Sequence, residues 1–144
     1  MITAEHTVTI QRPVEEVFAY LTDVSNVPQW QAGVSKTERE SGEPVAKGTR
    51  FTEVRKFLGR ELESTLEVTE YEQNHLFSIK TLVGPVPFEV RHVFQAADSG
   101  TIIEVSGSGE PGGFFKLGEA LVSRNAARTF RKDFATLKSI LERG

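Results

Sequence analysis

Alternation along the segment 86–95 places His92 on an otherwise apolar face, together with Phe88, Val90 and Phe94. Imidazole titrates near neutral pH, so a histidine on such a face can contact a ligand or transfer a proton. The same position also suits a core histidine with a single hydrogen bond. An edge position or an outward orientation is the third alternative, and all three stay open.

The segment 49–58 contains a second candidate group, because Glu53 and Arg55 alternate with Phe51 and Phe57. If the phenylalanines point inward, the two charges come with them. Buried charges are rare unless they are paired or contact a ligand. A Glu53–Arg55 pair that lines a pocket and a strand end splayed into solvent are therefore both compatible with the pattern.

Other familiar site types are not supported. The three histidines lack metal-binding spacing and cysteine is absent, so we expect no metal and no cofactor. Residues 107–112 spell G-x-G-x-x-G, but Asp133, the acidic residue at a suitable distance, falls in an expected helix. The preceding segments are hairpin-like, so we expect a strand-to-helix connection here and no nucleotide site.

The composition is that of an ordinary globular chain. Its 144 residues suit one domain over residues 1–144. With 17 Lys+Arg against 20 Asp+Glu, the net charge is −3, so no DNA partner is expected. No apolar run could span a membrane and the first residues do not resemble a signal peptide, which predicts a cytoplasmic location. The sequence leaves open whether the protein forms a homodimer.

The expected order of elements is strand, two short helices, six strands and a long helix. The first strand covers Ile2–Ile10, and the short helices cover Val14–Leu21 and Asp23–Gln29. Short spacers within 34–110 favour antiparallel hairpins, and alternation predicts a sheet covered on one side. A helix over 112–143 supplies the cover, which makes the fold class α+β.

The expected last helix differs between its two halves. In the first half, Gly118, Asn125 and Arg128 interrupt the apolar stripe, whereas the second half resembles solid core, with Phe130, Phe134, Leu137 and Leu141. A long helix laid across a curved sheet contacts it well at one end and stands away at the other. We therefore expect the Gly118 end to cover a cavity and the Phe134 end to anchor the fold. The alternative is that the rings fill this space completely.

The same helix is basic. From 116 to 143 it carries seven basic and three acidic residues. Arg124, Arg128, Arg131 and Lys132 could bind RNA or an acidic protein, or they could form a solvated helix face.

The stretch 12–30, RPVEEVFAYLTDVSNVPQW, closely resembles the opening of the polyketide cyclase/dehydrase and lipid-transport (SRPBCC) superfamily. Residues 48–51 (GTRF), 59–62 (GREL) and the terminal helix fit the same pattern. The resemblance implies the helix-grip fold of START domains and birch-pollen allergens: a seven-stranded antiparallel sheet wrapped around a long C-terminal helix, with a hydrophobic cavity between them. Family members include cyclases, lipid and hormone carriers, chaperone co-activators and ribosome-associated toxins, so the resemblance implies a cavity but no single activity.

The sequence therefore predicts a domain that binds a small hydrophobic or aromatic molecule between the sheet and the last helix. One alternative is a polyketide cyclase/dehydrase-type enzyme in which His92 acts with Glu53 or Arg55. Another is a protein- or RNA-interaction module that uses the basic helix. His92, Arg55 and Asn125 would supply the polar contacts to the bound molecule. The predicted lining consists of Trp30, Phe51, Arg55, Leu66, Phe77, Ile79, Phe88, Val90, His92, Phe115, Leu121 and Asn125.

Overall fold

The computed structural model describes residues 2–40, 42, 44–57, 59–85, 87–109 and 119–143. Three helical segments precede the second strand: α1 (Val14–Thr22), the 3-10 turn η1 (Val24–Asn26) and α2 (Val27–Trp30). The long helix α3 (Glu119–Arg143) follows the last strand. The strands are β1 (Ile2–Ile10), β2 (Val34–Arg39), β3 (Arg50–Phe57), β4 (Arg60–Glu72), β5 (Leu76–Val83), β6 (Phe88–Ala97) and β7 (Gly100–Gly109).

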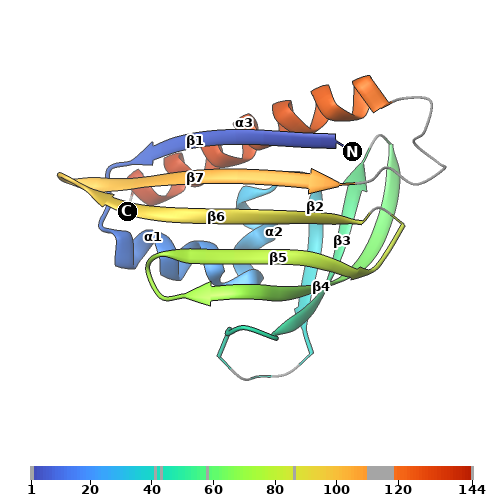
Figure 1. The fold of residues 1–144 in the computed structure, drawn as a ribbon, viewed down its shortest axis with the longest axis horizontal. Coiled ribbons are helices and arrows are strands. Elements are labelled where there is room, and N and C mark those ends of the chain that lie inside the picture. The colour runs from blue at the N-terminus through green and yellow to red at the C-terminus, as the bar shows by residue number, and fades with distance from the viewer. Residues whose placement is uncertain are drawn as a thin grey trace.

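The seven strands form one antiparallel sheet in the order β1-β7-β6-β5-β4-β3-β2. All helices lie on one side of this sheet, with α3 alongside β1 (Figure 1). The predicted α+β architecture is thereby confirmed, including the two short helices between β1 and β2 and the long C-terminal helix.

The sheet is strongly curved, so that β2 and β3 run across the direction of β1 and β7 (Figure 1). The pairing of β4 with β5 shifts register between Thr65 and Leu66 and again between Val68 and Glu70. The pairing of β2 with β3 shifts near Val34. Such bulges bend a strand and increase its twist. They allow the sheet to curl around the space beneath α3.

The helix α1 forms where the sequence predicts it. Pro13 occupies the N-cap, and Glu15 and Glu16 lie in the first turn, near the positive end of the helix dipole. Val17 and Phe18 are buried on the face toward the sheet, where Phe18 meets Phe94 of β6 with the rings edge to face, 4.9 Å apart. This contact fixes α1 against the centre of the sheet.

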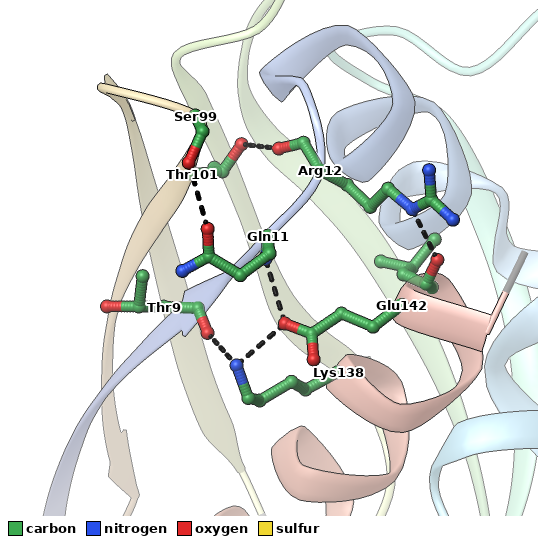
Figure 2. A network of polar contacts seen from close by, with 8 residues as sticks. Thr9, Gln11, Arg12, Ser99, Thr101, Lys138 and Glu142 are labelled. Atoms are coloured by element: carbon green, nitrogen blue, oxygen red, sulfur yellow. Dashed lines mark hydrogen bonds and ion pairs between the residues drawn. The ribbon is translucent and has the colours of Figure 1, made fainter.

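A group of polar contacts fastens the C-terminal end of α3 to the end of β1 (Figure 2). Lys138 donates from Nζ to the carbonyl of Thr9 (2.6 Å) and forms an ion pair with Glu142 (2.7 Å). Glu142 accepts from the backbone N–H of Gln11 (2.8 Å), and Arg12 donates from Nε to a carbonyl in the last turn of α3 (2.9 Å). The end of α3 is therefore fixed by direct bonds as well as by apolar packing.

Replacing Leu137 with alanine should destabilise the fold, because this side chain is fully buried between α3 and the sheet. We expect Leu137→Ala to lower the free energy of unfolding by about 2–5 kcal/mol in urea denaturation. Ser139→Ala on the exposed face of the same helix is the control and should change it by less than about 0.5 kcal/mol. Equal effects of the two variants would contradict this packing.

Candidate functional site

A cavity of about 190 Å³ lies between the curved sheet, α2 and α3. Aromatic and aliphatic side chains make up most of its wall, with a few polar groups among them. Most of the residues predicted from the sequence to line such a cavity do so. They are Trp30, Phe51, Arg55, Phe77, Ile79, Phe88, Val90 and His92.

The remaining predicted lining residues lie elsewhere. Leu66 pairs with Phe51 across β3 and β4 and is fully buried in a core cluster covered by η1 and α2, outside the cavity wall. Asn125 is half-buried but does not line the cavity; among the described residues of α3, its neighbour Ala126 does. Phe115, Gly118 and the side chain of Leu121 lie outside the described residues.

Among the residues of α3 whose side chains are described, those that line the cavity repeat at helical spacing: Ala126, Thr129, Phe130, Asp133 and Phe134. As predicted, Phe134 belongs to the hydrophobic core and Phe130 packs against it, but both rings also border the open space. Their surroundings explain it: Gly107 of β7 allows the Phe130 ring to approach so closely that a Cβ at this glycine would lie 2.9 Å from Cζ. The Phe134 ring lies between those of Trp30 and His92, with centroid distances of 5.1 and 5.9 Å.

Glu53 and Arg55 form a bidentate ion pair in the cavity wall. The Nε of Arg55 lies 3.0 Å from Oε2 of Glu53, and Nη2 lies 3.1 Å from Oε1. The same Nη2 donates to Oε1 of Gln31 at 2.6 Å. Glu53 is only 4% exposed, so the inward phase of β3 is the observed one. Two short charge-assisted bonds compensate for part of the cost of burying the pair.

Asp133 adds a second carboxylate at this polar end of the cavity. It is 6% exposed, and its Oδ1 accepts from the backbone N–H of Ala32 at 3.3 Å. Burial raises the pKa of Asp133, whereas the Ala32 hydrogen bond and the charge of Arg55 oppose this rise. The position of Asp133 in the cavity wall was not predicted from the sequence, although one signal was present. Asp133 follows Phe130 by three residues and precedes Leu137 by four, which places a carboxylate on the apolar stripe.

His92 is both a core residue and a cavity residue. It is 4% exposed, and its Nδ1 lies 3.0 Å from the carbonyl oxygen of Phe77. Because a carbonyl can only accept, Nδ1 carries the proton, and Nε2 of the neutral ring keeps its lone pair. Burial lowers the pKa of His92 to about 4, so the ring is neutral at pH 7. In the described part of the chain, no hydrogen bond joins His92 to Glu53 or Arg55, which bond to each other.

Trp30 carries a buried polar atom without a partner. Its indole Nε1–H has no hydrogen-bond partner among the described residues. A buried donor without a partner is unfavourable. Because this nitrogen has almost no accessible surface, we assign Trp30 an apolar contribution to the cavity wall.

Neither a metal-binding cluster nor a membrane-spanning helix occurs in the described ranges. No group of three or more His, Asp or Glu side chains that could hold a metal ion occurs there. None of the helices seen in these ranges is long and apolar enough to cross a membrane.

The amino-acid sequence matches one family model over residues 1–142, described as polyketide cyclase/dehydrase and lipid transport. The chain belongs to this family. Membership confirms the resemblance inferred from the residues 12–30, 48–51 and 59–62. No sequence among the curated proteins matches this chain significantly.

Several solved structures share the fold of this family member. The protein TTHA0849 from Thermus thermophilus has a TM-score of 0.84 at 18% identity and covers 96% of each chain. A START superfamily protein from Mycobacterium smegmatis has a TM-score of 0.78 at 16% identity over 99% of both chains. Ara h 8.0201 has a TM-score of 0.75 at 14% identity, covering 99% of this chain and 98% of its own. These similarities identify the helix-grip fold.

Acid should destabilise the protein partly through His92. Its pKa is about 4 in the folded chain and about 6.5 when unfolded, so between these values the unfolded state binds more protons. Stability is therefore lost as the pH falls from about 6.5 to about 4, by up to about 3 kcal/mol from this group. We expect urea unfolding at pH 7 and pH 4.5 to show a smaller pH effect in His92→Gln than in the wild type. An equal pH effect in both proteins would contradict the neutral, buried state of His92.

Removing only the cation of the buried pair should cost more than removing both charges. Arg55→Met leaves the Glu53 carboxylate buried without its partner, so we expect a loss of about 2–3 kcal/mol in the free energy of unfolding. The side chain of Arg55 retains 22% exposure, so the expected loss in the free energy of unfolding is smaller than for a fully enclosed pair. The double variant Glu53→Gln/Arg55→Met should recover most of the loss. Equal destabilisation of the single and double variants would show that the two charges do not interact.

Proposed function

We propose that this protein binds a small hydrophobic or aromatic molecule in the cavity between the sheet and α3. The observation that carries the proposal is the open volume of about 190 Å³, which the surrounding rings do not fill. A concave, mainly apolar wall with a few polar groups is typical of small-molecule sites. The chain belongs to the family described as polyketide cyclase/dehydrase and lipid transport, which agrees with this function.

The volume limits the size of the bound molecule. An apolar cavity of about 150 Å³ is large enough for benzene, whereas sites for drug-sized ligands have about 300–1,000 Å³. The cavity falls between these values, so a compact molecule with one or two rings, or a short aliphatic chain, suits it best. The Trp30, Phe130 and Phe134 rings offer flat surfaces on which an aromatic guest can pack.

A polyketide cyclase-type reaction is the second candidate, and Asp133 is the observation that favours it. A carboxyl group whose pKa is raised by burial can act as a general acid beside an apolar chain held in the cavity. The lone pair of His92 Nε2, in the same cavity wall, could then accept a proton. Loss of turnover in Asp133→Asn, with ligand binding retained, would support catalysis over simple binding.

The remaining expectations stay predictions. Arg124, Arg128, Arg131 and Lys132 are exposed on α3, as either an RNA- or protein-binding surface or a solvated face requires. The cytoplasmic location, the lack of a DNA partner and a homodimer are likewise predictions.

Filling the cavity should abolish ligand binding without unfolding the protein. Ala126 lines the cavity, so the ring introduced by Ala126→Phe should occupy the space that a ligand needs. The uncharged dye N-phenyl-1-naphthylamine should fluoresce strongly with the wild type and at least about tenfold less with Ala126→Phe at equal concentrations.

Ala135→Phe is the matched control, since Ala135 is exposed on the same helix. It should bind the dye as the wild type does, and circular dichroism should show that both variants are folded. If the wild type binds neither this three-ring dye nor the smaller two-ring 2-(2-naphthyl)ethanol, or if Ala126→Phe binds the dye equally well, the cavity is not the binding site.

A further inference from the structure

The charged residues in the described part of the cavity wall are mostly acidic. Glu53 and Asp133 contribute buried carboxylates, whereas Arg55 is the one permanent cation among them; Glu89 also borders the cavity, but its side chain is exposed. His92 is neutral at pH 7 because it is buried. With two buried carboxylates against one permanent cation, this part of the wall carries an excess of negative charge.

Arg55 is already engaged and is a poor receptor for an anionic ligand. Its Nε and Nη2 are held by the two oxygens of Glu53 at 3.0 and 3.1 Å, and Nη2 also contacts Gln31 at 2.6 Å. A ligand carboxylate would have to displace Glu53, which is almost completely buried and has no other ion-pair partner among the described residues. The displaced carboxylate would then be buried without a cation, which is strongly unfavourable.

Asp133 makes a further negative charge at this end of the cavity still less favourable. It is held near Arg55 and Ala32, and the charge of Arg55 already stabilises its carboxylate. The pKa of Asp133 is nevertheless raised by burial, so even one carboxylate is stabilised here less well than in water. A second carboxylate brought in by a ligand would add like-charge repulsion in a region of low dielectric.

From these contacts we infer that the cavity discriminates by head-group charge: it takes small aromatic or aliphatic molecules with an uncharged or cationic polar group and rejects carboxylates of the same shape. This inference rests on the proposed function and specifies the ligand class of the same site. It separates neutral alcohols, phenols, ketones and amines from aryl and fatty acids.

The polar atoms of the wall suit such head groups. Nε2 of the neutral His92 ring can accept from a hydroxyl or amine. A cationic amine gains attraction from Glu53 and Asp133 and can also lie against the face of an aromatic ring such as Phe130. A carboxylate has no donor of its own to offer these acceptors.

The test compares three ligands that share one skeleton and differ in charge: 2-naphthylacetic acid, 2-(2-naphthyl)ethanol and 2-(2-naphthyl)ethylamine. Each competes at pH 7.5 with N-phenyl-1-naphthylamine. Because this dye is uncharged, the charge of the cavity wall does not itself change how tightly the dye binds. We expect the alcohol and the amine to displace the dye, and the acid to need at least about a tenfold higher concentration.

The gap between acid and alcohol is the ratio of the concentrations at which each displaces half of the dye. Glu53→Gln should narrow this gap by about tenfold, because it removes one carboxylate and frees the charge of Arg55. Glu63→Gln is the matched control: it makes the same charge change at an exposed position of β4 that does not line the cavity, and it should leave the gap unchanged. If circular dichroism shows that Glu53→Gln is not folded, Asp133→Asn provides the same test from α3.

The outcomes separate the two proposals. If neither the dye nor any of the three ligands binds, the proposed function fails and the inference fails with it. If all three ligands displace the dye at similar concentrations, the cavity binds small molecules but the charge discrimination is overturned. Narrowing of the gap by Glu63→Gln to the same extent would also overturn it, because net protein charge would then be the cause.

Discussion

The structure depends on one constraint: α3 is fixed firmly at its C-terminal end while the sheet curls away from it. Leu137 and Phe134 bury their side chains against the sheet, and Lys138 and Glu142 bond directly to the end of β1. Farther toward its N-terminus, α3 faces a sheet bent by bulges in β4 and β2. Two surfaces joined at one end and diverging at the other leave a space that side chains of ordinary size do not close.

Sequence periodicity predicted the elements and part of the site for an identifiable reason. Alternation in β6 placed His92 with Phe88 and Val90, and all three line the cavity. In β3, alternation left two phases open, because Glu53 and Arg55 are charged while Phe51 is apolar. Only the pairing of the charges with each other, which depends on their geometry, makes the inward phase favourable. The bulges have no comparable signal, so the curvature, and with it the cavity position of Phe130, could not be predicted from α3 alone.

An unfilled space within a protein has a measurable cost. The side chains around the space lack the packing contacts that a filled core would give them, which is a loss of stability. Substituting larger apolar residues at Ala126 or Ala4 could reduce this loss, since both face the space. A chain that keeps small residues there forgoes stability, which a bound apolar molecule would restore by occupying the volume.

The buried ion pair supports the same conclusion from electrostatics. Replacing a buried pair by well-packed apolar residues is often neutral or stabilising, so stability alone does not explain Glu53 and Arg55. Nor does the pair complete the packing of the core, since it borders an open space instead of filling it. What the pair does provide is a rigid arrangement of charge, fixed by Gln31 on one side and facing Asp133 on α3. A fixed charge pattern at one end of an apolar cavity affects only a molecule that enters it, and it acts most strongly on the polar end of that molecule.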